Sequence, residues 1–146
     1  MNVFETHSFE THSGEETIEL GRRIAAELPR KAVVLLIGNL GAGKTTLAKG
    51  IISGLGAAAI EEVSSPTFTL IHEYGRVYHI DLYRLDRAEE VATLGLDEIF
   101  ERDTVALIEW GERFPRLMPL ERFEIRLRPG NAEDARLIQI EHVGKV

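Results

Sequence analysis

A glycine-rich stretch that follows a run of apolar residues decides the fold class of this chain. The stretch is Gly38-Asn39-Leu40-Gly41-Ala42-Gly43-Lys44-Thr45, a glycine and four residues followed by Gly-Lys-Thr. Six apolar residues at 32–37 precede it, as in a strand that is buried on both faces, and a helix-compatible run begins at Lys44. A strand, a glycine-rich loop and a helix in this order are typical of a loop that binds nucleotide phosphates.

Each position of this loop has a physical role. Glycines admit positive φ angles, which turn main-chain N–H groups inward as a nest for an anion. The start of the next helix adds free N–H groups and its dipole. Lys44 supplies a charge for the β- and γ-phosphates, and the Thr45 hydroxyl supplies a ligand for Mg²⁺. The alternative is a glycine-rich turn that fits by chance, on the order of 1% for ordinary composition. The predicted nucleotide-binding residues here are Gly38, Asn39, Leu40, Gly41, Ala42, Gly43, Lys44, Thr45 and Thr46.

The remaining patterns indicate an α/β domain. Helices are predicted from Ser13, as N-cap, to the residue before Pro29, at 44–53, and at 87–101 with an interruption near Gly95. Strands are predicted at 32–37, 68–74, 77–83, 104–110, 122–128 and 137–142, and the second and third of these form a hairpin. We therefore expect one domain, residues 1–146, with three layers as in P-loop NTPases and a mixed, mostly parallel central sheet with hairpin additions.

Composition limits the partners and the compartment. The 146 residues carry a net charge of −7 and include no cysteine, which excludes disulfides and thiolate chemistry. The negative balance argues against a surface that holds nucleic acid non-specifically, because neutralising phosphates requires clustered Lys and Arg. No apolar run is long enough to span a membrane, and the first residues lack the features of a signal peptide, so we expect a cytoplasmic protein.

Two carboxylates follow apolar strands and are candidates for metal binding and catalysis. Asp81 ends the run Val-Tyr-His-Ile-Asp, and Glu109 ends Ala-Leu-Ile-Glu. An acid at this place faces the metal in many P-loop proteins, directly or through water. Asp81 has the alternative of capping the next turn, and Glu109 that of an ordinary carboxylate at a strand end. The segment Ser64-Ser65-Pro66-Thr67 is either a loop that offers a hydroxyl to the metal or γ-phosphate, or a turn before a strand.

Four motifs in order resemble the TsaE family, the small bacterial ATPases of the tRNA N6-threonylcarbamoyladenosine pathway. The motifs are the stretch 38–46, Ser65-Pro66-Thr67-Phe68, Tyr78-His79-Ile80-Asp81-Leu82-Tyr83-Arg84-Leu85 and Ile108-Glu109-Trp110. The resemblance extends from about residue 17 to residue 136. It implies that ATP and Mg²⁺ bind, that the TsaB–TsaD enzyme pair is the partner in modifying adenosine 37 of tRNA, and that ATP hydrolysis resets the complex between turnovers.

The resemblance also implies roles for single residues. Thr45 and Glu109 would serve Mg²⁺, while Asp81 would polarise the attacking water or hold the metal's outer ligands. Thr67 would lie near the γ-phosphate. The segment from Ser13 to Thr17 would approach the adenine, and Arg136 would reach the nucleotide. The catalytic candidates are Asp81, Glu109, Thr67 and Lys44, and the metal candidates are Thr45, Glu109 and Asp81.

Two other functions fit the phosphate-binding loop. One is a small-molecule or nucleoside kinase, which requires an acceptor pocket and a lid that closes over the phosphates. The other is a nucleotide-gated binding module with negligible turnover alone. The chain lacks the Asn-Lys-x-Asp pattern that reads guanine, which favours ATP. With no basic patch, an ATPase of this kind would contact tRNA mainly through its partner proteins.

Overall fold

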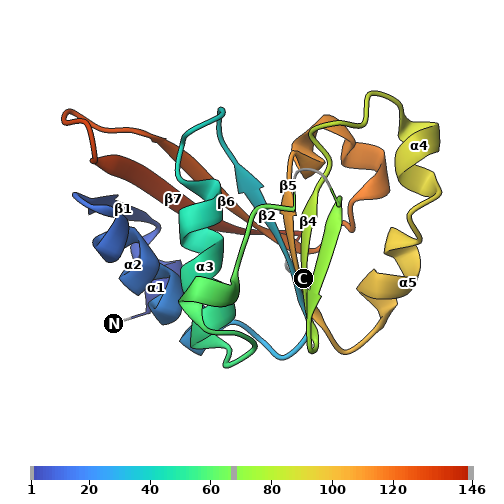
Figure 1. Ribbon diagram of the computed structural model, residues 1–146, viewed down its shortest axis with the longest axis horizontal. Coiled ribbons are helices and arrows are strands. Elements are labelled where there is room, and N and C mark those ends of the chain that lie inside the picture. The colour runs from blue at the N-terminus through green and yellow to red at the C-terminus, as the bar shows by residue number, and fades with distance from the viewer. Residues whose placement is uncertain (1, 67–68, 145–146) are drawn as a thin grey trace.

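A single seven-stranded sheet runs through the protein in the order β1-β7-β6-β2-β5-β4-β3 (Figure 1). The computed structural model describes residues 2–66 and 69–144. The strands are β1 Ser8–Thr11, β2 Ala32–Ile37, β3 Ile71–Tyr74, β4 Val77–Asp81, β5 Val105–Glu109, β6 Arg122–Pro129 and β7 Arg136–Val143. The helices are α1 Val3–Thr6, α2 Gly14–Glu27, α3 Lys44–Gly54, α4 Ala88–Ala92 and α5 Leu96–Glu101, with short 3₁₀ turns at Ile60–Glu62, Gly111–Arg113 and Pro115–Leu117.

The centre of the sheet is parallel and its edges are antiparallel. Strands β6, β2, β5 and β4 pair in parallel, whereas β1 with β7, β7 with β6 and β3 with β4 pair antiparallel. The mixed sheet is confirmed, and its parallel part is confined to the four central strands. Parallel strands end at the same edge, so β2, β4 and β5 bring their last residues together.

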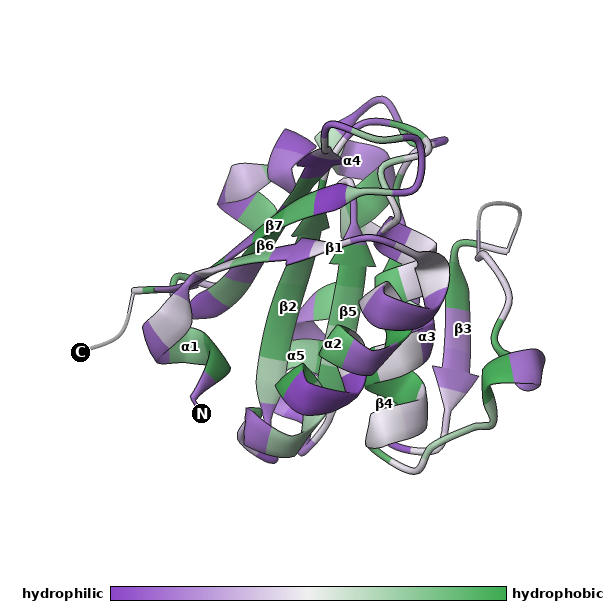
Figure 2. Ribbon diagram, turned by 90° about the vertical axis from the view of Figure 1, so that its left-hand side faces the viewer, coloured by the Kyte–Doolittle hydropathy of each residue, from purple (hydrophilic) through white to green (hydrophobic). Residues whose placement is uncertain are grey.

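Helices cover both faces of the sheet. Helices α1, α2 and α3 lie on one side and α4 and α5 on the other (Figure 1). The side chains of β2 alternate between the two cores: Val34 and Leu36 pack toward α2 and α3, and Val33 and Leu35 pack toward α4 and α5. Burial on both faces explains why β2 and β5 are hydrophobic almost throughout (Figure 2). The expected three layers are confirmed.

Close packing of glycines fixes the position of α3. A Cβ on Gly50 of α3 would lie 2.1 Å from the carbonyl oxygen of Ile18 in α2, and a Cβ on Gly21 would lie 2.7 Å from that of Leu47. The two helices therefore approach each other at a distance that only glycine permits. At the start of the loop, a Cβ on Gly38 would lie 2.6 Å from the Leu127 carbonyl oxygen of β6. The loop at 38–45 thus begins against β6 and leads into α3, which packs closely on α2.

Most predicted elements are present, with shifts at their ends. Ser13 accepts a hydrogen bond from the main-chain N–H of Glu16 and so begins α2, and Gly95, with φ of 74°, separates α4 from α5. The predicted hairpin is confirmed as β3 and β4, although Phe68 at its predicted start lies outside the described residues. Helix α1 and strand β1 were not predicted. Among residues 2–66 and 69–144, no helix combines the length and apolar character that crossing a membrane requires.

Candidate nucleotide-binding site

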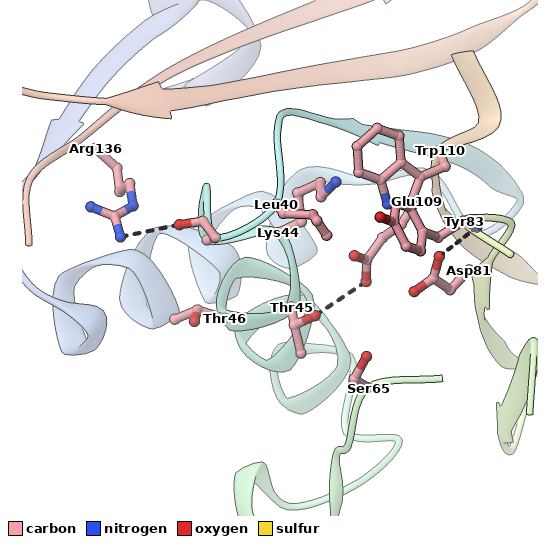
Figure 3. Close-up of a pocket in the computed structure, with 12 residues that line it drawn as sticks. Leu40, Lys44, Thr45, Thr46, Ser65, Asp81, Tyr83, Glu109, Trp110 and Arg136 are labelled. Atoms are coloured by element: carbon pink, nitrogen blue, oxygen red, sulfur yellow. Dashed lines mark hydrogen bonds between the residues drawn. The ribbon is translucent and has the colours of Figure 1, made fainter. Parts of the chain in front are cut away.

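A cavity of about 330 Å³ lies where the parallel strands end and α3 begins (Figure 3). Ligands of open α/β sheets bind at this edge. The cavity brings together the loop, the two predicted carboxylates with their neighbours Tyr83 and Trp110, and one residue from each of two further segments. It is lined by Leu40, Gly41, Gly43, Lys44, Thr45, Thr46, Ser65, Asp81, Tyr83, Glu109, Trp110 and Arg136.

The loop has the backbone of an anion nest. Gly41 and Gly43 adopt φ angles of 78° and 100°, which residues with a Cβ atom rarely adopt. Gly43 is the N-cap residue of α3 and makes no side-chain cap hydrogen bond. The first N–H groups of an 11-residue helix therefore point toward the cavity, together with the positive end of its dipole. This end of α3 is suited to an anion.

Lys44 places its ammonium group inside the site. Its side chain is buried; Nζ donates a hydrogen bond of 2.6 Å to the Gly38 carbonyl oxygen and lies 3.6 Å from the centre of the Trp110 ring. Burial lowers the pKa of Lys44 below 10.5, and the negative charges of Glu109, Glu112 and Asp81 oppose that shift. These contacts are those of a cation in a partly dry site, where a phosphate interacts with it more strongly than in water.

Glu109 and Asp81 lie side by side at the ends of β5 and β4, where they are register partners. Both are buried, and Figure 3 shows their carboxylates pointing into the same space near Thr45. Glu109 Oε2 accepts a hydrogen bond of 3.3 Å from Thr45 Oγ1. Asp81 Oδ1 accepts one of 2.9 Å from the main-chain N–H of Tyr83, so the alternative role of Asp81 as a turn cap is also present. Its contact with the cavity is additional to that role.

The oxygen atoms at this point fit Mg²⁺. One hydroxyl and two carboxylates are the hard ligands that Mg²⁺ prefers. Within the described part of the chain, no group of three or more His, Asp or Glu side chains is arranged to hold a metal by itself. Mg²⁺ commonly takes one or two protein ligands and completes its shell with phosphate oxygens and water. The residues present therefore fit a metal that enters together with a triphosphate.

Two residues with ionisable side chains near the site were missed by sequence reasoning. His79 is fully buried, and its Nε2 lies 2.6 Å from Glu109 Oε2. Alternate residues of a strand share a face, so His79 and Asp81 lie on the same face of β4. This spacing in the sequence indicates that His79 lies near the carboxylates. Glu112, which follows Trp110, has a pKa raised above 4.5 by burial, against the opposing effect of charges on Lys44, Arg113 and Arg126. Its irregular 3₁₀ turn gave no such signal.

Not every predicted site residue reaches the cavity. Arg136 does: its Nη2 donates a hydrogen bond of 3.3 Å to the Gly41 carbonyl oxygen. Ala42 is buried below the loop, and Asn39 is exposed beside a separate hollow next to β6. Ser13 caps α2, and the buried Thr17 hydroxyl lies 2.7 Å from that of Thr11. The nucleotide roles of Ser13 and Thr17 remain predictions, and Thr67 lies outside the described residues.

Comparison with known proteins identifies similar chains along most of this sequence. A family model described as threonylcarbamoyl adenosine biosynthesis protein TsaE matches residues 11–138. The chain is 41% identical over 138 residues to the tRNA threonylcarbamoyladenosine biosynthesis protein TsaE of Bacillus subtilis, a match that covers 92% of this chain and 84% of that protein. It is 40% identical over 129 residues to the protein of that name from Treponema pallidum, and this match covers 84% of this chain and 94% of that protein.

A solved structure extends the similarity to three dimensions. The crystal structure of Bacillus subtilis YdiB superposes with a TM-score of 0.75 at 35% sequence identity, and the match covers 94% of this chain and 85% of that one. Family model, relatives and solved structure all cover the phosphate-binding loop and both strands that carry the carboxylates. The chain therefore belongs to the TsaE family.

Proposed function

We propose that this protein is an Mg²⁺-dependent ATP-binding and ATP-hydrolysing subunit of tRNA threonylcarbamoyladenosine biosynthesis, acting on adenosine 37 of tRNA together with TsaB–TsaD-type partners. The observation that carries the proposal is the meeting of Lys44 and Thr45 with Asp81 and Glu109 in one cavity. An anion nest and a cation for the phosphates lie next to oxygen ligands for a metal. The family names of the relatives supply the pathway.

The binding of ATP follows from the loop. Main-chain N–H groups at 41–45 would receive the β- and γ-phosphates, and Lys44 Nζ would exchange its contact with the Gly38 carbonyl oxygen for a phosphate oxygen. Arg136 lies on the opposite side of the loop from Asp81 (Figure 3), and from there its guanidinium would contact the nucleotide. Tyr83 and Trp110, whose ring centres lie 5.2 Å apart, form the wall of the cavity next to the carboxylates.

Hydrolysis requires that charge be neutralised and water be oriented. Bound Mg²⁺ would supply charge neutralisation at the β- and γ-phosphate oxygens. Thr45 Oγ1 and Glu109 are the side chains that would hold it. Asp81, at the adjacent position of the next strand, would accept a hydrogen bond from the attacking water and so orient it. The Tyr83 N–H fixes one oxygen of Asp81 and thereby the direction of its carboxylate.

Net charge supports indirect contact with tRNA. A chain with a formal charge of −7 has little capacity to neutralise phosphates by itself. We therefore place tRNA on the TsaB–TsaD partners, with this chain acting on their complex through nucleotide-dependent binding.

Steady-state hydrolysis with purified components tests the proposal. ATP turnover is measured for this chain alone, with the TsaB–TsaD pair, and with the pair plus tRNA, each beside a Lys44→Ala control. The proposal predicts Mg²⁺-dependent turnover that the partner pair stimulates and that the control lacks. Phosphate transfer to a small acceptor would indicate a kinase, and nucleotide-dependent partner binding without turnover would indicate a gated binding module.

A further inference from the structure

A chain of polar contacts links three elements behind the cavity. The Nε2 atom of His79 in β4 lies 2.6 Å from Oε2 of Glu109 in β5. The same oxygen accepts the hydrogen bond from Thr45 Oγ1 at the start of α3. A carboxylate oxygen accepts hydrogen bonds, so the imidazole Nε2 carries the hydrogen in this contact. One oxygen of Glu109 is thereby fixed from two directions.

Packing alone does not explain an imidazole at position 79. The ring is fully buried in β4, and its neighbours Tyr78 and Ile80 belong to the apolar core on the other face. Within the described residues, Nδ1 is buried without a hydrogen-bond partner. A buried polar atom without a partner costs free energy that a leucine at this place would not. The contact of Nε2 with Glu109 is the feature that offsets this cost.

We infer that His79 is a positioning residue that fixes the Glu109 carboxylate beside the Thr45 hydroxyl and so determines how tightly the protein–nucleotide complex holds its metal. The inference rests on the proposed Mg·ATP site. Residues that hydrogen-bond to a metal ligand orient it, and their loss commonly lowers metal affinity by about 10- to 100-fold. Without His79, the Glu109 carboxylate can adopt side-chain rotamers that turn it away from Thr45.

The experiment separates the metal contribution from the nucleotide contribution. A non-hydrolysable ATP analogue is titrated calorimetrically into the full chain, once with Mg²⁺ and once with EDTA. The ratio of the two dissociation constants reports the metal-dependent part of the affinity. Wild type is compared with His79→Gln, whose amide nitrogen reaches about as far as Nε2, and with His79→Asn, whose amide nitrogen reaches only about as far as Nδ1. His79→Leu removes the donor altogether.

The inference predicts that His79→Asn and His79→Leu reduce this ratio by about tenfold, with unchanged affinity in EDTA, while His79→Gln keeps the ratio within about threefold of wild type. Because His79 acts through Glu109, adding His79→Leu to Glu109→Gln causes no further reduction. A matched control is His142→Leu. This substitution also breaks a contact between a histidine and a glutamate, because His142 Nε2 lies 3.0 Å from Glu121 Oε2, but the pair lies away from the cavity. That variant keeps the wild-type ratio.

Two results would overturn the inference while leaving the proposed function intact. If all three His79 variants keep the wild-type ratio, Glu109 does not need the hydrogen bond from His79 to hold the metal. If His79→Gln loses as much as His79→Leu, the ring matters for packing and not for its hydrogen bond. A wild-type protein whose affinity is the same in Mg²⁺ and EDTA contradicts the proposed metal site itself, and the inference fails with it.

Discussion

The ammonium group of Lys44 lies 3.6 Å from the centre of the Trp110 ring, close enough for a cation–π contact within the cavity. A triphosphate that binds the loop must take over this charge. Trp110 is the only tryptophan in the chain, so its emission reports on the contact. We expect the emission to change as an ATP analogue is titrated in the presence of Mg²⁺, and Trp110→Phe to abolish the signal. Constant emission at saturating analogue would show that Lys44 does not move toward the phosphates.

Removal of the Lys44 charge should weaken nucleotide binding. In Lys44→Ala the main-chain nest remains, but the only ammonium group among the described residues that line the cavity is lost, and with it a charge-assisted hydrogen bond worth roughly 1.5–3 kcal/mol. Calorimetry should show affinity weakened by at least about tenfold. Lys49→Ala, on the same helix but outside the cavity lining, is the control and should bind normally. Equal affinity of Lys44→Ala and wild type would contradict the assignment of Lys44.

Glu109 should separate binding from turnover. Glu109→Gln keeps the size of the side chain but removes the negative charge next to Thr45 and Asp81. We expect ATP analogue to bind in EDTA as in wild type, and hydrolysis in the complex with partners to fall on the order of 100-fold, because electrostatic stabilisation at the reacting end is lost. Undiminished turnover of the variant would remove Glu109 from the mechanism.

Much of the site was predictable because it depends on local patterns. The loop, the strand before it and the positions of Asp81 and Glu109 follow from glycine spacing and hydrophobic runs. His79 was not predicted as part of the site, because its contact with Glu109 joins residues 30 positions apart and depends on the parallel pairing of β4 with β5. Strand β1 was missed for a related reason, since its four residues become a strand only by pairing with β7 at the other end of the chain.

Glu112 should make stability depend on pH. Burial raises its pKa above 4.5 in the folded protein, so in the range above pH 4.5 the folded state holds more protons at this group than the unfolded state. The contribution of Glu112 to the free energy of unfolding is therefore fully present below pH 4.5, and it is lost as the pH rises through the pKa of Glu112 in the folded protein. We expect Glu112→Gln to gain stability relative to wild type between pH 4 and pH 8 in urea denaturation, with exposed Glu133→Gln as the control. A difference between Glu112→Gln and wild type that is constant with pH would refute this.

The crossing of α2 and α3 should tolerate no side chain at Gly50. Gly50→Ala would place a Cβ 2.1 Å from the Ile18 carbonyl oxygen, so α3 must shift, at a cost of about 1–3 kcal/mol. Because α3 carries Lys44 and Thr45, nucleotide affinity should fall as well. Gly14→Ala is the matched control, since a Cβ there meets nothing within 4 Å. Denaturation and calorimetry on both variants check this, and equal stability of the two would contradict the close approach of the helices.

We expect the main-chain amides of residues 38–45, together with Lys44, to enclose the triphosphate of Mg·ATP. A crystal structure of the protein grown with a non-hydrolysable ATP analogue and Mg²⁺ tests it most directly. We expect phosphate density against the N–H groups that follow Gly41, with Lys44 Nζ in contact with it and the metal between Thr45 and the carboxylates of Asp81 and Glu109. Analogue bound elsewhere, or a loop that stays empty under saturating Mg²⁺ and analogue, would show that this loop is not the triphosphate site.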